Sequence, residues 1–281
     1  MWTEKNRQRY DRSQLRYPSD LTNREWGLVE PLIPPAKPGG NRRRVEVREI
    51  VNAVMYILST GCQGRALPND LPPRRTVHDY LDSWIYDRTL DRIHYTLYVE
   101  CREFEGRQVS PTAAIIDSQS VKGAEKSGAR IDCHGYDAAK KIKGKKRHVL
   151  VDTLGLLLHA IVHPANIQDR DGGILLLSSL PVIFPFLKKL FADAGYQGPQ
   201  FHKGLAKILP ALDPEVIKRP GDKTNHTFVV LPRRWVIERT IAWLNRCRRL
   251  AKDWENLDRK ALAFLRLASV RLMLRRLCNA T

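Results

Sequence analysis

A change of hydrophobic period near residue 106 divides this sequence into two parts. Before it, apolar residues recur with the helical period in VEVREIVNAVMYILSTG and in TVHDYLDSWIYDRTLDRIHYTLYVECREF. Thr22 and Glu25 have the spacing of a capping box, which predicts a helix start within LTNREWGLVEPLI. We therefore expect a basic arm over residues 1–19 and a small all-helical domain over residues 20–105. Helix-turn-helix DNA binding and a plain helical bundle are both open for that domain.

After residue 106, short strands become frequent. AAIID and LKKLFAD indicate strands, and RHVLVDTLGLLLHAIVHPA indicates a hairpin that turns at Leu154 and Gly155. The other expected elements are helices in IQDRDGGILLLSSL and GPQFHKGLAKIL, a short strand in EVIKRP, and one long helix in PRRWVIERTIAWLNRCRRLAKDWE. This order is typical of a ribonuclease H-like fold, an α/β architecture with a mixed sheet. We expect this ribonuclease H-like domain, with the C-terminal helices, to occupy residues 106–281.

Two of these strands end on an acidic residue. Asp117 ends AAIID, and Asp193 ends LKKLFAD just before Ala194 and Gly195, where the chain can turn sharply. Strand ends in such a sheet open onto one crevice, so adjacent strands can present both carboxylates at the same point. A lone strand-terminal Asp more often caps the next turn. Two together repel each other unless a cation separates them, and their hard oxygens suit Mg²⁺ or Mn²⁺.

A third acidic residue, Glu238, lies among basic residues on the long expected helix. Arg234, Glu238, Asn245 and Arg249 fall on one helical stripe because their separations are four, seven and four positions. That stripe suits a metal ligand flanked by phosphate-binding arginines. A surface ion pair between Arg234 and Glu238 is the other reading, and the spacing alone leaves both open.

The charge of the chain favours a polyanionic partner. Lysine and arginine number 48 against 30 acidic residues, which gives a net charge of +18. Residues 118–147 hold nine basic and three acidic side chains, and residues 231–281 hold thirteen and four. Each of these two runs lies close to a candidate active-site acid, and this concentration indicates phosphate binding more than a merely solvated surface.

The five cysteines are far apart and form no C-x-x-C pair, which argues against a disulfide framework or a zinc knuckle. The first twenty residues contain no apolar signal segment. The most apolar run is broken by Pro181 and Pro185 and is too short to span a bilayer. These features predict a cytoplasmic protein.

Several long motifs resemble the DDE transposases of bacterial insertion sequences, most closely the insertion-sequence-5 family. They are AAIIDSQSVK, the block from GYDAAKK to NIQDRDGG, LFADAGYQG and RRWVIERTIAWLNRCRRLAKDWE, with STGCQGRALPNDLPPRRTVHDYL in the helical part. The broader group carries the signature Y-x2-R-x3-E-x6-K. This chain has Leu231 and Asn245 in place of the Tyr and Lys. It also has Gly64 where similar proteins have Trp.

The resemblance implies an enzyme that cleaves phosphodiester bonds at insertion-sequence ends and joins the freed 3′-OH to target DNA. It implies that Asp117, Asp193 and Glu238 are the catalytic residues and hold two Mg²⁺ or Mn²⁺ ions. Its partners would be the terminal inverted repeats and target DNA, with a homodimer pairing two ends. The expected DNA-binding residues are Lys122, Lys140, Lys141, Lys143, Lys145, Lys146, Arg147, Arg233, Arg234, Arg239, Arg246 and Arg249.

Two other functions remain open at this stage. A DNA-binding regulator, or an inactive protein derived from such an element, would bind the ends without cutting them. A ribonuclease H-like nuclease would cut without needing particular terminal sequences. A serine nucleophile at Ser118 or Ser120 is disfavoured, because neither residue lies in a G-x-S-x-G elbow.

Overall fold

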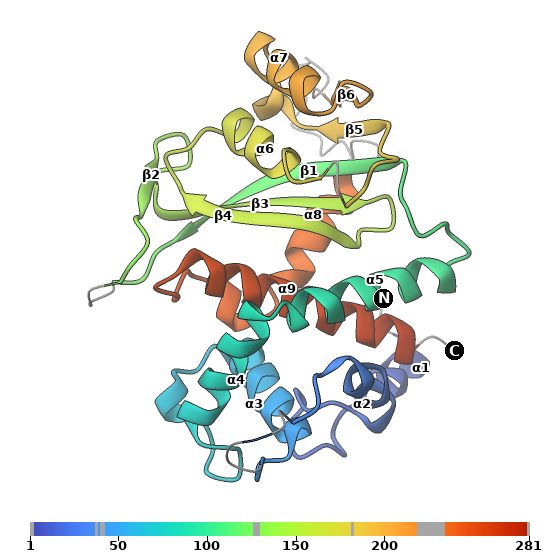
Figure 1. Ribbon diagram of the computed structural model, residues 1–281, viewed down its shortest axis with the longest axis vertical. Helices are drawn as coiled ribbons and strands as arrows, with labels where there is room; N and C mark the ends of the chain where they lie inside the picture. The colour runs from blue at the N-terminus through green and yellow to red at the C-terminus, as the bar shows by residue number, and fades with distance from the viewer. Residues whose placement is uncertain are drawn as a thin grey trace. The chain divides into compact units, whose positions relative to one another are not determined.

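The computed structural model describes residues 3–36, 39, 43–125, 130–180, 183–217 and 234–279 (Figure 1). The chain forms two compact units. The helical unit comprises Met1–Arg107, Leu244–Ala251 and Ala263–Thr281, and the sheet unit comprises Gln108–Trp243 and Lys252–Leu262. This grouping differs from the expected domain boundaries, because most of the C-terminal helix packs with the N-terminal helices. Among the described residues, no helix has the length and apolar character needed to cross a bilayer.

The helical unit is built from amphipathic helices. Its elements are α1 (Glu4–Arg9), α2 (Asn23–Val29), η1 (Glu30–Leu32), α3 (Val47–Thr60), η2 (Gly64–Ala66), α4 (Arg74–Tyr86), α5 (Thr89–Phe104), η4 (Arg248–Leu250) and most of α9 (Asp258–Cys278). The predicted capping box is confirmed, since Thr22 and Glu25 each accept from the other's backbone N–H at the start of α2. The turn after α3 has Gly61 in the left-handed region, with φ of 70°. Helix α4 begins at Arg74, directly after Pro73.

In the part of the sheet unit that the structure describes, the strands form a mixed six-stranded sheet. Its elements are β1 (Ala113–Lys122), β2 (Gly135–Asp137), β3 (Ile142–Asp152), β4 (Leu157–Pro164), α6 (Asp169–Leu177), β5 (Lys189–Ala192), η3 (Ala194–Tyr196), α7 (Pro199–Ile208), β6 (Asp213–Val216) and α8 (Arg234–Leu244). The strand order is β2-β3-β1-β5-β6, with β4 also paired to β3. Strands β1, β5 and β6 are parallel, while β3 is antiparallel to β1 and to β4. The predicted α/β class with a mixed sheet is confirmed.

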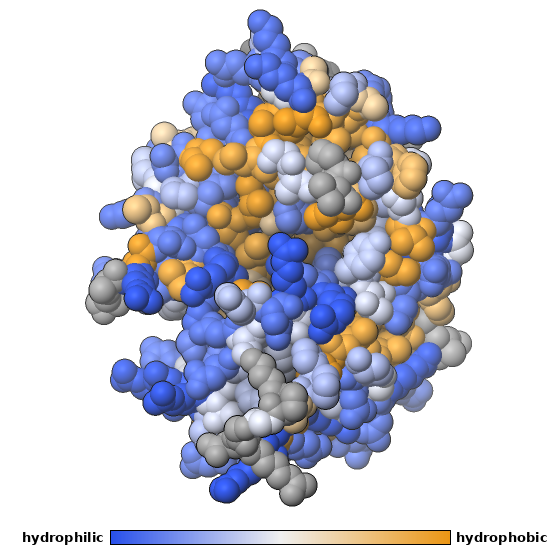
Figure 2. All heavy atoms as spheres, viewed as in Figure 1, coloured by the Kyte–Doolittle hydropathy of each residue, from blue (hydrophilic) through white to orange (hydrophobic). Residues whose placement is uncertain are grey.

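Helices cover both faces of this sheet (Figure 1). On one face, Gly172 of α6 packs directly on His148 of β3. On the other, Thr240 of α8 donates a hydrogen bond to the carbonyl of Gly155 in the β3–β4 turn, at 2.9 Å. On the face of the molecule that Figure 2 shows, apolar side chains gather over the sheet and hydrophilic ones over α7. The sheet and its covering helices therefore enclose the core of this unit.

The end of one strand, β1, and the end of one helix, α8, differ from the sequence prediction. Strand β1 does not end at Asp117 but continues to Lys122, because β3 keeps pairing with it as far as Gly144. On its other edge, β1 pairs with β5 only as far as Ile115. The predicted long helix is also wrong, since α8 ends at Leu244 and a 3₁₀ turn follows at 248–250. At Asp117, β1 is therefore still paired with β3 on one edge but no longer with β5 on the other.

Candidate active site

Asp117 and Asp193 lie side by side at the carboxyl end of β5. The last parallel pair between β1 and β5 joins Ile115 to Phe191, and each aspartate comes two residues later on its own strand. Asp117 Oδ1 accepts from the backbone N–H of Ser118 at 2.7 Å. Asp193 Oδ1 accepts from the N–H of Gly195 at 2.9 Å, which fixes the turn into η3. The sequence prediction that adjacent strands bring these two acids together agrees with this register.

Burial raises the pKa of the Asp117 carboxyl to about 6, and the nearby negative charge of Asp193 adds to this effect. The N–H of Ser118 and the positive charges of Arg234 and Lys140 act in the opposite direction. Two carboxylates held this close in a partly desolvated place store electrostatic repulsion. A positive charge between them would relieve it.

Arg234 connects the third acid to this pair. Its Nη2 lies 3.9 Å from Asp193 Oδ2, and its Nε lies 3.0 Å from Glu238 Oε1, one turn along α8. The guanidinium also interacts electrostatically with Asp117. All three predicted acids therefore surround one arginine. The ion pair between Arg234 and Glu238 that the sequence offered as an alternative is present in the structure.

The aspartate pair fits a divalent cation better than the full triad does. Two close carboxylates, one of them largely desolvated, are the donor set that hard divalent ions favour. Glu238 is half exposed and paired with Arg234. Within the described part of the chain, no three His, Cys, Asp or Glu side chains are arranged to hold one metal ion. Glu238 must therefore leave Arg234 before it can share a cation with the aspartates.

A buried polar network behind Asp117 was not predicted from the sequence. Ser118 Oγ donates to Asp169 Oδ1 at 2.8 Å, and Lys146 Nζ donates to the same oxygen at 2.8 Å. Lys146 also lies 3.4 Å from Asp137 Oδ2. The other oxygen of Asp169 points toward Gly195, where an added Cβ would meet both Asp169 Oδ2 and Asp193 Oδ1 within 3.1 Å. Asp169 is thus a further carboxylate beside the aspartate pair.

A second buried cluster extends this network on the α6 face. His148 Nδ1 lies 3.0 Å from the hydroxyl of Tyr196, and the rings of His148 and His163 stack at 4.9 Å. Burial, with the neighbouring His163, lowers the pKa of His148 to about 3, so this imidazole stays neutral at physiological pH. Burial and the nearby aspartates raise the pKa of Tyr196 well above its ordinary value. The sequence offered only a weak signal here, a Tyr directly after the Asp193 turn.

Three of the predicted DNA-binding residues are buried, so they cannot serve as surface phosphate contacts here. Lys145 is 1% exposed and donates to the carbonyl of Cys133, and it also pairs with Asp258 at 2.7 Å. Lys146 is held by the network described above. Arg147 is 2% exposed, and burial lowers its pKa to about 10 although acidic neighbours oppose this. These corrections follow from the position of all three residues in the central strand β3.

The other four predicted DNA-binding lysines are exposed: Lys122, Lys140, Lys141 and Lys143. Lys140 Nζ lies 3.3 Å from the carbonyl oxygen of Ser118, so its charge is next to Asp117. Lys141 has a positive φ of 54° at the start of β3. Lys140 therefore places an exposed positive charge beside the aspartate pair.

The predicted arginines have different surroundings. Arg239 lies between the rings of Trp235 and Trp243, with centroids at 4.5 and 4.7 Å. Arg246 is exposed, whereas Arg249 donates to the carbonyl of Cys62 at 3.2 Å inside the helical unit. Arg233 lies outside the described residues, as does Leu231. Asn245, which replaces the Lys of the signature, comes one residue after the end of α8.

Two family descriptions match the sequence. Residues 109–273 match the family described as "Transposase DDE domain". Residues 21–94 match the family described as "Putative transposase of IS4/5 family". The first match contains Asp117, Asp193 and Glu238, and the second covers α2 to α4 with the start of α5.

Curated relatives from Burkholderia cepacia point in the same direction. One is the "Putative transposase for insertion sequence element IS402", which is 32% identical over 131 residues, 44% of this chain and 60% of the relative. This chain therefore matches less than two thirds of that protein. Another is the "Insertion element IS402 uncharacterized 16.2 kDa protein", which is 30% identical over 103 residues, 34% of this chain and 69% of the relative.

Proposed function

This chain belongs to the transposase DDE domain family, and we propose that it cleaves phosphodiester bonds at insertion-sequence ends and joins the freed 3′-OH to target DNA. One observation carries the proposal. Asp117 and Asp193 each come two residues after the last paired residues of the parallel strands β1 and β5, and Arg234 lies close to both Asp193 and Glu238. The DDE domain implies a ribonuclease H-like fold, and a mixed sheet with antiparallel β3 next to parallel β1 and β5 supports that reading.

The DDE domain also implies the use of divalent metal ions. We propose that Asp117, Asp193 and Glu238 hold two Mg²⁺ or Mn²⁺ ions, with Glu238 released from Arg234. Such ions would lower the pKa of an attacking water and stabilise charge on the leaving 3′ oxygen. The raised pKa of Asp117 supports this assignment, because a cation would favour the ionised carboxyl that burial disfavours.

The residues around the acids have roles that need no metal. Lys140, exposed and close to Asp117, would bind a phosphate oxygen of the substrate strand, and the other exposed lysines of this run would bind neighbouring phosphates. Asp169, which accepts from Lys146, also accepts from Ser118 Oγ, and the Ser118 N–H in turn orients the Asp117 carboxyl. Tyr196 excludes water behind the aspartates because it is completely buried.

The proposed partners are the terminal inverted repeats of an insertion sequence and its target DNA. Two ends must be brought together before joining, so a homodimer on DNA is the natural assembly. We further propose that the protein works in the bacterial cytoplasm, on nucleoid DNA. The helical unit, which contains the second matched family segment, is a candidate for recognising the ends.

Cleavage of end DNA by single-residue variants tests this function. Asp117→Ala and Asp193→Ala should abolish Mn²⁺-dependent nicking of a duplex that carries the element's own end, while both variants still bind that duplex. Asp171→Ala is the matched control, because Asp171 is an exposed acid of the same unit, on α6, and should cut normally. Undiminished nicking by Asp117→Ala would contradict the proposal.

A second function has one observation in its favour. Glu238 is paired with Arg234, and the three acids do not form a common metal site among the described residues. That arrangement suits a protein that binds insertion-sequence ends without cutting them. Tight end binding by the wild-type protein, with no nicking at any Mn²⁺ concentration, would favour this alternative.

A further inference from the structure

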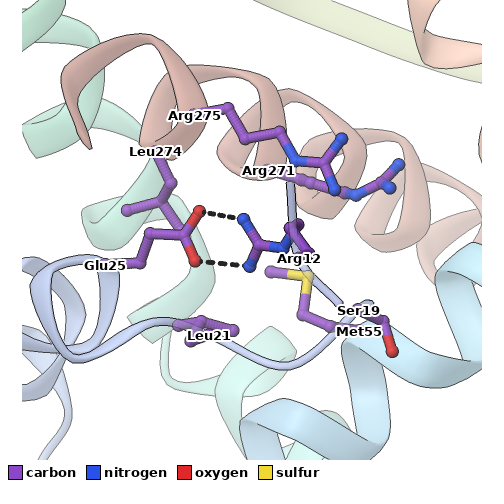
Figure 3. A pocket seen from close by; sticks show the side chains of 8 residues that line it. All are labelled: Arg12, Ser19, Leu21, Glu25, Met55, Arg271, Leu274 and Arg275. Carbon is purple, nitrogen blue, oxygen red and sulfur yellow. Dashed lines mark hydrogen bonds and ion pairs between the residues drawn. The ribbon is translucent and has the colours of Figure 1, made fainter. Parts of the chain in front are cut away.

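Three arginines from distant parts of the chain meet in a small pocket of the helical unit (Figure 3). Arg12 comes from the segment between α1 and α2, and Arg271 and Arg275 come from α9. Their guanidinium groups lie close to one another, and Glu25 of α2 approaches Arg12 from one side. We call this cluster the arginine pocket.

The charges in the arginine pocket do not balance. Arg12 makes a two-pronged ion pair with Glu25, with N–O distances of 2.8 and 2.7 Å, and Glu25 is the one acid among the eight lining residues. The charges of Arg271 and Arg275 therefore have no carboxylate of their own in the pocket. Leu21, Met55 and Leu274 also line it, and such apolar walls weaken the screening of these charges.

The hydrogen bonds of the two α9 arginines are also incomplete. Arg271 Nη1 donates to Cys247 Sγ at 3.3 Å, and a thiol is a weak acceptor for a guanidinium. The side chain of Arg275 makes no hydrogen bond or ion pair with any described residue. The Nε atoms of Arg12 and Arg275 are both buried without a hydrogen-bond partner. Burial, with Arg271 and Arg12 nearby, lowers the pKa of Arg275 to about 10.

From this geometry we propose that the arginine pocket binds a phosphate group, with one of its oxygens inside. The pocket volume is about 10 Å³, which is about the space that one water-sized atom needs. A guanidinium binds phosphate oxygens through planar, charge-assisted hydrogen bonds, and two such groups that make no ion pair with a carboxylate of the pocket provide the donors. The phosphate would connect α9 to the N-terminal segment. The source is either free inorganic phosphate or the backbone of bound DNA.

Thermal unfolding of the full chain tests the site without any measurement of cleavage. Inorganic phosphate in the millimolar range, at constant ionic strength, should raise the Tm of the wild-type protein by about 2–4 °C. Chloride and acetate at the same concentrations should not. Arg275→Gln should remove the response. Arg276→Gln is the matched control and should keep it, because Arg276 is the next residue of α9 and pairs instead with Glu105.

A DNA titration distinguishes the two sources of phosphate. If the group belongs to the DNA backbone, Arg275→Gln should reduce the slope of log affinity against log salt by about 0.9, the value for one lost phosphate contact. If it is free phosphate, the variant should keep the wild-type slope and lose only the Tm response. Either result supports the site, and neither depends on the proposed catalytic function.

Three outcomes would overturn the proposal. The first is a Tm response and a DNA salt slope that are both the same in Arg275→Gln and wild type. The second is an equal Tm response to chloride or acetate, which would mean a general anion effect. The third is a large drop in the Tm of Arg275→Gln, relative to wild type, in phosphate-free buffer. An unpaired buried charge lowers stability, so removing the charge of Arg275 should not destabilise the protein. Arg271→Gln repeats each measurement at the second unpaired arginine.

Discussion

Arg234 Nε lies 3.0 Å from Glu238 Oε1, one turn along α8. The same guanidinium lies 3.9 Å from Asp193 Oδ2, so it already neutralises the acids that a divalent cation would need. A bound cation and Arg234 therefore compete for the same carboxylates. An ion pair of this kind is worth a few tenths of a kcal/mol to about 1 kcal/mol.

Replacing Arg234 should therefore strengthen metal binding. We expect Arg234→Gln to bind Mn²⁺ about two- to fivefold more tightly than the wild type, measured by calorimetry without DNA. Arg239→Gln is the control on the same helix, since Arg239 stacks between two tryptophans. Weaker Mn²⁺ binding by Arg234→Gln would mean that the arginine orders the acids rather than competing for them.

Without bound metal, ionisation of the Asp117 carboxyl should lower the unfolding free energy of the protein as pH rises. Its pKa in the folded protein is about 6, above the ordinary value of 3.8, so the fold favours the protonated carboxyl. This contribution is complete below about pH 4 and is lost as pH rises through 6. Asp117→Asn mimics the protonated form and should exceed the wild type in unfolding free energy at pH 7.5, by up to about 3 kcal/mol.

Denaturant unfolding in EDTA across this pH range measures the effect. The difference between wild type and Asp117→Asn should grow between pH 4 and 6 and stay constant above pH 7. Asp171→Asn, at an exposed position, should show no such change. A constant difference at all pH values would show that Asp117 titrates normally.

The buried and exposed lysines of the basic run should respond in opposite ways. Lys145→Gln should lower the unfolding free energy by about 2–3 kcal/mol, because it leaves Asp258 and a buried carbonyl without their cation. It should leave the salt dependence of DNA binding unchanged. Lys143→Gln should keep stability within about 0.5 kcal/mol and reduce the salt slope by about 0.9. Measurements of Tm and DNA affinity on both variants check this, and a reversed pattern would restore Lys145 as a DNA contact.

Gly172 should tolerate no side chain. A Cβ there would lie 2.3 Å from His148 Nε2 and 2.6 Å from His163 Nε2, inside the packed interface between α6 and the sheet. We expect Gly172→Ala to lose about 1–3 kcal/mol of stability in chemical denaturation. Gly27→Ala, in α2 with nothing within 4 Å, should gain about 0.5–1 kcal/mol from helix propensity. Equal behaviour of the two variants would mean that α6 can move away from the sheet.

Local signals in the sequence predicted the elements that depend on neighbouring residues. The Thr22 and Glu25 capping box and the turn at Gly155 both need only a few consecutive positions. The pairing of Asp117 with Asp193 was also accessible, because both strands carry their acid at a corresponding place.

The features that were missed depend on residues far apart in the chain. A run of lysines indicates an exposed surface, but Lys145 is buried because Asp258, 113 positions later, reaches it. Asp169 gains its place beside the aspartates from Ser118 and Lys146, which lie on other elements. No Gly or Pro follows Leu244 closely in the sequence, so the end of α8 there has no local signal. Short-range patterns carry no information about such partners.

The last segment of the helical unit begins at Ala263. There Arg266 of α9 pairs with Asp91, Ser269 contacts His94 at 3.2 Å, and Met273 is buried. During synthesis on a ribosome, helices α1 to α5 therefore emerge long before the helix that completes their core. Their apolar surface stays exposed to water until the residues of the sheet unit and then α9 have been translated. For this protein, helices α1 to α5 should therefore become stable only after α9 has been made, although they precede the sheet unit in the sequence.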